Sequence, residues 1–358
     1  MRKLLVVMIM LVFVVSGLAG CAKDAGYKIA MITDAGEIDD KSFNQGTWEG
    51  IEKFAKENDK TYKYYKPTEV SDDAYLAAID LAIEGGAEVV VTPGFLFEPA
   101  IYEAQDLYPD TSFIILDGTP HTPDYSTFRI ESNVYSIFYA EQQSGFLAGY
   151  AAVKDGYTKL GFMGGMAVPA VVRFGYGFVQ GAEYAAQEMG LESVEIKYHY
   201  TGDFAATPKN QTTAATWYAD GTEVIFACGG KVGNSVMAAA EAAGAKVIGV
   251  DVDQSAESET VITSAKKELG VSVYAGLESY YAEDFKGGVS EVLDITVDGV
   301  GLPFATSRFE TFTEDDYNAI YDALVADTDG IRTSILADTD VEAATDIPTE
   351  IVAVTIVE

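Results

Sequence analysis

The sequence predicts an α/β fold made of two doubly wound lobes, each built on a parallel sheet. From Tyr27 onward, short β-rich runs alternate with longer stretches of helical periodicity. Strands separated by helices of this length form βαβ units, which assemble into parallel sheets. Two such sets follow one another, one from residue 27 to about 133 and the other from about 134 to 254. A chain of 358 residues is long enough for both.

The predicted elements follow in chain order. Strand patterns cover Lys28–Thr33, Tyr62–Lys66, Glu88–Thr92, Ser112–Leu116, Lys159–Met163, Val194–Tyr200, Glu223–Ala227 and Lys246–Val250. Helical patterns cover Asn44–Glu57, Asp73–Glu84, Pro99–Leu107, Ile137–Val153, Val171–Met189, Lys209–Ala219 and Gly233–Ala243. In the first of these helices, Trp48, Ile51 and Phe54 recur on one face, as in a helix that packs on a sheet.

The later part of the chain is expected to return to lobes already begun. We assign residues 27–133 and about 255–300 to the first lobe, and residues 134–254 and about 301–330 to the second. Residues 331–358 form a polar C-terminal segment whose packing the sequence does not reveal. Two similar lobes joined by several chain crossings suit a hinged clamshell with a ligand cleft between them. A two-domain enzyme has the same layer order, so the fold alone does not decide the function.

The first twenty residues read as a secretory signal rather than as part of the fold. A basic start precedes the apolar run Leu4–Val15, which is too short to span a bilayer comfortably. The string Leu18-Ala-Gly-Cys21 that follows resembles the processing signal of bacterial lipoproteins. That resemblance implies a lipid on Cys21, a tether over residues 21–26, and a protein anchored on the extracytoplasmic face of the cell membrane without crossing it.

Charge and composition exclude several kinds of partner and chemistry. The net charge of −33 repels nucleic acid and disfavours a phosphorylated ligand. The sequence contains two cysteines, so acylation of Cys21 leaves Cys228 without an intramolecular disulfide partner. Two histidines and one remaining cysteine offer little for nucleophilic or zinc chemistry. We therefore expect no cofactor and no metal.

Several polar turns follow predicted strands, where open parallel sheets bind ligands. The densest one, Asp34 to Gln45, crowds carboxylates, an amide and an aromatic ring between the first strand and the first helix. The structural alternative for Asp40 or Ser42 is that its side chain caps the helix. Phe43 is harder to explain structurally, because a ring in a polar turn at a sheet edge is often placed to stack on a ligand.

The string Asp40-Lys-Ser-Phe-Asn-Gln45 resembles the signature of the basic membrane lipoprotein family of purine-nucleoside receptors. Further matching strings run through both lobes. They are Phe146-Leu-Ala-Gly-Tyr150, Gly164-Gly-Met166, Arg173-Phe174, Gly177-Phe178, Thr201-Gly-Asp-Phe204, Gly229-Gly230, Ile248–Gln254 and Thr263-Ser264 with Lys267. The resemblance implies the type I periplasmic-binding-protein fold, a monomer that delivers its ligand to an ABC permease, and no enzymatic activity.

The resemblance also implies roles for individual residues. The purine base would lie between the rings of Phe43 and Phe204, and such stacking contributes roughly 1–3 kcal/mol per base. The base edge and nearby polar groups would be bound by Asp34, Asn44 and Asp117, and the ribose by Gly230, Asp251 and Lys267. A neighbouring cation should keep Asp251 ionised, and whether Lys266 or Lys267 faces the ligand stays open.

Two other functions remain to be distinguished. A nucleoside hydrolase uses an acidic metal-binding turn that the string Asp34 to Asp40 faintly resembles, but that pattern needs an aspartate where this chain has Ile32. A receptor of the same fold for a sugar or another small solute would also use aromatic rings with Asp and Asn. The family resemblance favours nucleosides.

Overall fold

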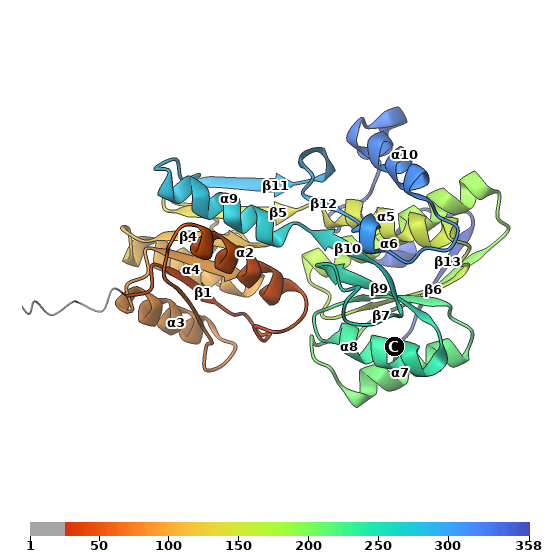
Figure 1. The fold of residues 1–358 in the computed structure, drawn as a ribbon, viewed down its shortest axis with the longest axis horizontal. Coiled ribbons are helices and arrows are strands. Elements are labelled where there is room, and N and C mark those ends of the chain that lie inside the picture. The colour runs from red at the N-terminus through yellow and green to blue at the C-terminus, as the bar shows by residue number, and fades with distance from the viewer. Residues whose placement is uncertain (1–25) are drawn as a thin grey trace, which may run out of the picture.

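Two parallel sheets, one in each lobe, organise residues 26–358, which are the residues that the computed structural model describes. The lobes lie side by side and are joined by thin connecting segments (Figure 1). This arrangement confirms the predicted α/β fold with two parallel-sheet lobes. The predicted signal peptide, the lipidation site Cys21 and nearly all of the tether lie outside the described residues.

The first sheet has the strand order β11-β5-β4-β3-β1-β2, and all of its neighbouring strands are parallel. Its strands are β1 (Ile29–Ile32), β2 (Tyr62–Tyr65), β3 (Val89–Pro93), β4 (Ser112–Leu116), β5 (Val134–Tyr139) and β11 (Val289–Leu293). Its helices are α2 (Phe43–Glu57), α3 (Asp72–Glu84), α4 (Glu98–Leu107) and α9 (Leu269–Tyr281).

Successive side chains of a strand point to opposite faces of the sheet, which explains why helices cover both faces. In β1, Ile29 and Met31 join the apolar cluster of α2 and α9, whereas Ala30 and Ile32 join that of α3 and α4. A strand buried on both faces needs a continuous apolar run, as the β1 sequence has.

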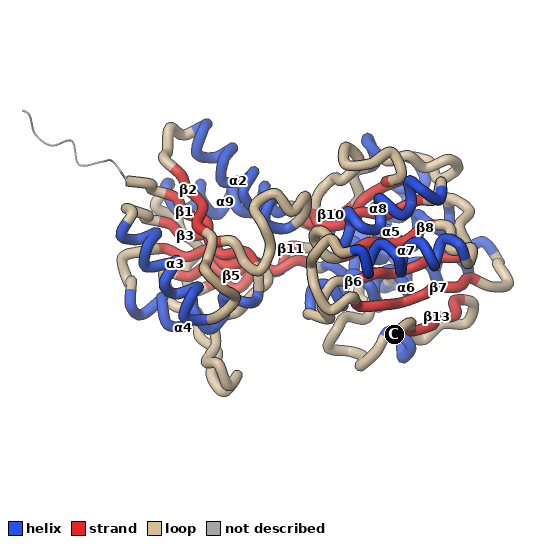
Figure 2. Tube along the Cα trace, turned by 90° about the horizontal axis from the view of Figure 1, so that it is seen from below, coloured by secondary structure: helices blue, strands red, loops and turns tan. Residues whose placement is uncertain are grey.

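The second sheet has the order β12-β10-β9-β8-β6-β7-β13, with β12 antiparallel to β10 and the other pairs parallel. Its strands are β6 (Lys159–Gly164), β7 (Val194–Tyr200), β8 (Val224–Cys228), β9 (Lys246–Asp251), β10 (Val261–Lys267), β12 (Val300–Gly301) and β13 (Val352–Ile356). The helices are α5 (Glu141–Lys154), α6 (Pro169–Met189), α7 (Pro208–Ala219), α8 (Val232–Ala243) and α10 (Glu314–Val325). Short 3₁₀ turns cover Phe95–Phe97, Ile295–Val297, Phe304–Thr306, Thr328–Gly330 and Ala344–Asp346. Figure 2 shows α7 and α8 in front of this sheet.

Helices α5 and α6 approach so closely that only glycine fits at their contact. A Cβ atom at Gly149 would lie 2.1 Å from the carbonyl oxygen of Phe178, and one at Gly181 would lie 1.9 Å from that of Phe146. Gly145 and Gly177 face neighbouring backbone in the same way. The close contact fixes the first turns of the two helices beside each other.

The strand pairing corrects three of the predicted boundaries. Val134–Tyr139 forms β5 and pairs with β4, so the first lobe continues to Tyr139 instead of ending at residue 133, and Ile137 belongs to a strand rather than to a helix. Val261–Lys267 forms β10 beside β9, which places it in the second lobe instead of the first. In the C-terminal segment, β13 pairs with β7 and extends the second sheet.

The chain therefore crosses between the lobes after β5, after β10 and after β11. No helix within residues 26–358 has the length and apolar character needed to cross a membrane.

Candidate functional site

The turn after β1 is held by the carboxylate of Asp40. Its oxygens accept hydrogen bonds from the backbone N–H groups of Ser42, Asn44 and Gln45 at 2.9, 3.0 and 3.1 Å. Of the two candidate caps, Asp40 therefore satisfies the start of α2, because the Ser42 side chain forms no cap bond. The Asn44 amide donates to Asp34 at 2.8 Å and to Asp40 at 2.9 Å, which joins the two carboxylates.

Asp34 is held in a setting that disfavours its charge. Burial raises the pKa of the Asp34 carboxyl to about 6, while hydrogen bonds from Asn44 and from the backbone of Gly36 oppose the shift. The group therefore titrates close to neutral pH, and small changes around it alter its protonation.

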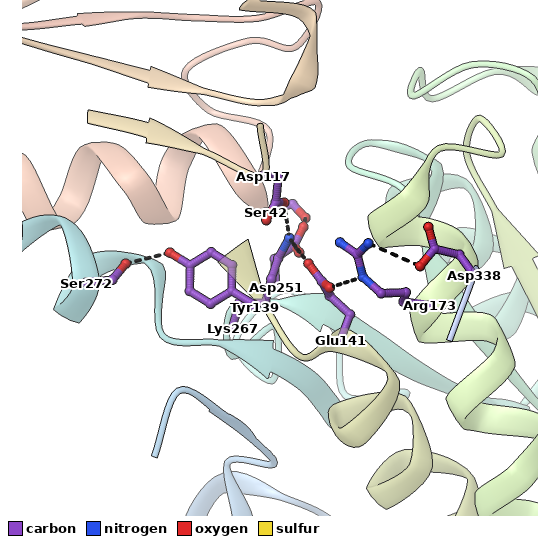
Figure 3. Close-up of polar contacts among 9 residues, drawn as sticks. All are labelled: Ser42, Asp117, Tyr139, Glu141, Arg173, Asp251, Lys267, Ser272 and Asp338. Carbon is purple, nitrogen blue, oxygen red and sulfur yellow. Dashed lines mark hydrogen bonds and ion pairs between the residues drawn. The ribbon is translucent and has the colours of Figure 1, made fainter. Parts of the chain in front are cut away.

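Lys267 lies at the centre of a buried cluster between the lobes (Figure 3). Its side chain is 3% exposed, and its Nζ lies 2.5 Å from Asp117, 3.3 Å from Glu141 and 3.7 Å from Asp251. The same nitrogen lies 4.5 Å from the centre of the Phe43 ring, which places a cation against an aromatic face. Four of the residues named from the sequence thus meet at one point.

The structure distinguishes the two neighbouring lysines. Lys266 forms an ion pair with Glu268 at 2.6 Å and is partly exposed. Because neighbouring side chains of a strand point to opposite faces, Lys266 and Lys267 cannot both face the cluster. Lys267 is the lysine that lies among the carboxylates.

The charges of the cluster shift one another's titration. Burial opposes the charge of Lys267, but Asp117, Glu141 and Asp251 outweigh it and raise the pKa of the ammonium group. Burial raises the pKa of the Asp117 carboxyl to about 7, although Lys267 offsets part of the shift. One oxygen of Asp117, Oδ1, is buried without a hydrogen-bond partner among the described residues.

Two of these carboxylates belong to residues with an unusual backbone conformation. Asp117 has φ +53° directly after β4, and Asp251 has φ +66° at the end of β9. Left-handed φ values are uncommon for residues other than glycine and cluster at functional sites. Burial also raises the pKa of Asp251, against the attraction of Lys267 and the hydrogen bond that the Ser42 hydroxyl donates to it.

Contacts across the lobe boundary show that the carboxyl ends of the two sheets face each other. The Gln254 side-chain amide donates to the carbonyl oxygen of Lys41 at 2.7 Å. Ion pairs join Lys231 to Asp39 at 3.1 Å and Lys41 to Glu257 at 3.5 Å. The turn after β1 therefore lies against the turns that follow β8 and β9.

Phe204 and Gly230 lie on the second-lobe side. The partly exposed Phe204 ring packs over Gly165, where a Cβ atom would approach its Cδ1 to 2.4 Å. The Phe204 carbonyl accepts from the N–H of Lys231 at 3.1 Å, and Gly230 beside it has φ +53°. Within residues 26–358 the Phe204 ring does not pair with that of Phe43, and the two come from opposite lobes.

Glu141 and Arg173 belong to the cluster but were not predicted as site residues. Glu141 is fully buried at the start of α5, and its Oε2 lies 2.6 Å from Nε of Arg173. Arg173 also pairs with Asp338 of the C-terminal segment at 3.3 Å. The sequence carried one signal, the Arg173-Phe174 string, but nothing in it linked Arg173 to Glu141.

Comparison with known proteins identifies the family. Residues 27–340 match the family model described as "ABC transporter substrate-binding protein PnrA-like". The chain is 32% identical over 320 residues to the "ABC transporter nucleoside-binding protein BmpA" of Lactococcus lactis subsp. cremoris, covering 82% of this chain and 87% of the relative. It is 32% identical over 266 residues to "Basic membrane protein A1" of Borrelia garinii subsp. bavariensis, covering 73% and 75%.

Solved structures agree on the fold. A solute-binding protein of an ABC transporter system from Aeropyrum pernix K1 superposes with a TM-score of 0.69 at 24% identity, covering 90% of this chain and 84% of that one. A corresponding protein from Conexibacter woesei gives 0.66 at 23% identity, covering 86% and 97%. The family match confirms the prediction that the chain is not an enzyme. The chain belongs to the Bmp family of PnrA-like substrate-binding proteins of ABC transporters.

Proposed function

We propose that the protein binds purine nucleosides such as guanosine, inosine and adenosine between its two lobes and presents them to an ABC permease. The observation that carries this proposal is the placement of two rings at sheet ends that face each other. Phe43 begins α2 in the first lobe, and Phe204 lies between β7 and α7 in the second. A purine has two π-faces, and a ring from each lobe suits both. The 32% identical relative from Lactococcus lactis is named as nucleoside-binding.

The base edge is assigned to the first lobe. Asp34 and Asn44 follow β1 and are hydrogen-bonded to each other, so their orientation is fixed before a ligand arrives. Carboxylate oxygens accept hydrogen bonds from the N–H groups of a purine, and the Asn44 amide has both donor and acceptor atoms. Asp117 supports this assignment with a buried oxygen that lacks a partner among the described residues.

The ribose is assigned to Gly230, Asp251 and Lys267. Asp251 can accept from vicinal hydroxyl groups, and Lys267 can donate to a ribose oxygen. Gly230 allows a backbone group to approach closely, because it has no Cβ and adopts φ +53°.

Substrate-binding proteins of ABC importers act outside the cytoplasm. We assign Cys21 as the lipidated residue after removal of residues 1–20, which would hold the protein, as a monomer, at the membrane beside its permease.

The test is a calorimetric titration of a chain from residue 22 onward, which keeps every described residue. The protein is unfolded and refolded to remove carried-over ligand, and then titrated with guanosine, inosine, adenosine, uridine and ribose. Saturable binding of the purine nucleosides, with no response to ribose and with the nucleoside recovered intact, is the expected result. Binding of ribose alone would assign the site to sugars, and release of free base would identify a hydrolase.

A further inference from the structure

Glu141 belongs to the buried cluster, but its carboxylate is already bound by other charged side chains. Its side chain is 0% exposed, and both of its oxygens are engaged, Oε1 with Lys267 at 3.3 Å and Oε2 with Arg173 at 2.6 Å. It is the first residue of α5, directly after the chain leaves the first lobe. Glu141 therefore lies where the chain passes from β5 of the first lobe to α5 of the second.

The closely packed helices bring its partner to it. Arg173 lies in the first turns of α6, and the glycine contact between α5 and α6 sets these turns side by side, since Gly145 faces the backbone of Phe174. Arg173 is 15% exposed and reaches Asp338 at 3.3 Å with its outer nitrogen. A guanidinium group that binds two carboxylates in a fixed plane holds each of them in one orientation.

The groups that surround the Lys267 ammonium come from both lobes and from the crossings between them. Its carboxylates are Asp117 after β4, Asp251 at the end of β9 and Glu141 of α5. Its aromatic neighbours are Phe43 of α2, Tyr139 of β5 and Phe174 of α6. Of the three carboxylates, Glu141 is the one that an arginine within residues 26–358 binds in turn.

We propose that Glu141, held by Arg173, is a positioning residue that fixes the ammonium group of Lys267 between the lobes and thereby sets the affinity of the site without touching the ligand. The inference deepens the proposed function and rests on it, because it assigns Lys267 to the ligand. Without Glu141, the carboxylates that pair with the Lys267 ammonium would be Asp117 of the first lobe and Asp251 of the second. The position of the ammonium group would then change when either lobe moved.

The charge of Glu141 affects a quantity that can be measured, the pKa of Asp117. Burial raises the pKa of Asp117 to about 7, and repulsion by the Glu141 carboxylate adds to that rise. Burial opposes the charge of Glu141, but Arg173 and Lys267 outweigh it and hold the pKa of Glu141 below its usual value. Neutralising Glu141 should therefore lower the pKa of Asp117 and move the acid limb of ligand binding to lower pH.

The variants are Glu141→Gln, which keeps the shape and removes the charge, and Arg173→Lys, which keeps the charge and removes the planar fork. Glu268→Gln is the matched control, because Glu268 pairs with the neighbouring Lys266 at 2.6 Å outside the cluster. Guanosine dissociation constants are measured by calorimetry between about pH 5.5 and pH 8.5. The carboxyl titration of Asp117 is followed by carbon NMR in ligand-free protein and assigned with Asp117→Asn.

We expect Glu141→Gln to weaken guanosine binding about tenfold at the alkaline end and to move the acid limb downward, with a smaller loss for Arg173→Lys and none for Glu268→Gln. Affinity within about twofold of wild type with an unchanged pH profile would overturn the proposal. If Glu141→Gln does not fold, Arg173→Lys decides by its affinity alone, and a guanosine dissociation constant within about twofold of wild type would overturn the proposal. If wild-type protein binds no nucleoside, the proposed function fails. An Asp117 titration that does not move in Glu141→Gln overturns the positioning role separately.

Discussion

Phe43 lies where the proposed base and the buried charge cluster meet. It is the first residue of α2, its ring centre is 4.5 Å from the Lys267 ammonium, and it remains partly exposed. Attraction between the cation and the ring therefore helps to position Phe43, in addition to packing. No cation of the described part of the chain lies over the Phe204 ring, which is held instead by its close contact with Gly165.

Replacing either ring with leucine should weaken guanosine binding, since stacking on one ring contributes roughly 1–3 kcal/mol. We expect Phe43→Leu and Phe204→Leu each to raise the dissociation constant by about 5- to 150-fold, measured by calorimetry. Phe128→Leu is the control, because that exposed ring lies in the loop between β4 and β5 and packs on His121. Equal affinities for the two site variants and the control would contradict the stacking role.

The raised pKa of Asp34 predicts a pH dependence of binding. An ionised carboxylate accepts hydrogen bonds from two N–H groups of a base edge, whereas a protonated one presents an O–H donor on one oxygen. The pKa of Asp34 is about 6 in place of its ordinary 3.8. Protonation therefore replaces one acceptor with a donor and weakens the other as the pH falls through 6, and the affinity should fall by up to about tenfold per pH unit below that value.

Asp34→Asn should bind more weakly at neutral pH and lose this component of the profile. Asp253→Asn should keep it, because the hydrogen bonds that Asp253 accepts from Thr306 and Ser255 outweigh burial and hold the pKa of that carboxyl low. A wild-type affinity that is constant from about pH 5 to pH 8 would show that Asp34 does not bind the ligand as a carboxylate.

At the scale of elements, the α5–α6 contact positions Glu141 against Arg173. The carbonyl oxygen of Phe174, next to Arg173, lies 2.1 Å from where a Cβ of Gly145 would be. The two helices can approach this closely because glycine has no Cβ, and the close approach brings the two charged groups within 2.6 Å.

Gly149→Ala should therefore destabilise the protein, because the added methyl group would meet backbone that cannot move without separating the helices. We expect a loss of about 1–3 kcal/mol in the free energy of unfolding, measured by urea denaturation. Gly233→Ala is the control in α8, where the nearest atom to an added Cβ is 3.8 Å away, and alanine there should be neutral or stabilising by about 0.5–1 kcal/mol. Similar losses for the two variants would contradict the packing argument.

At the scale of the whole molecule, one loop of the second lobe carries several contacts to the first. Gln254 is buried, and its amide bridges Lys41 of the first lobe and the N–H of Val250 in the second. Lys41 itself adopts φ +61°, which is unusual for a residue with a long side chain. Hinge motion that opens the lobes must break this bridge.

Gln254→Ala should lower the free energy of unfolding by about 1–3 kcal/mol, because it leaves the buried N–H of Val250 and the partly buried carbonyl of Lys41 without this partner. Lys231→Ala, which removes a partly exposed ion pair across the same boundary, should change it by no more than about 1 kcal/mol. Urea denaturation monitored by tryptophan fluorescence compares the two. A larger effect for Lys231→Ala would mean that exposed charge, and not the buried amide, holds the lobes together.

Much of the fold could be predicted from the sequence, because βαβ periodicity is local. The main failure was β5, where Val134–Tyr139 is an almost fully buried run. A strand buried on both faces lacks the alternation that separates strand from helix, so its last residues were assigned to the following helix. The assignment of β10 and β13 to the second sheet depends on strand pairing, which local patterns do not specify.

The candidate site was predictable where a motif occupied a single turn. Asp34 and Asn44 are such a case, since they come from one strand-to-helix turn and are hydrogen-bonded in the structure. Glu141 was not predictable, because its importance arises from a lysine 126 positions away and an arginine 32 positions away. Such contacts follow from tertiary packing and leave no periodic signal.

The most direct test of the central claim is a crystal structure of the protein with guanosine. We expect the purine between the rings of Phe43 and Phe204, with Asp34 and Asn44 at the base edge and Asp251 and Lys267 at the ribose. A nucleoside bound elsewhere, or one whose base stacks on neither ring, would contradict it.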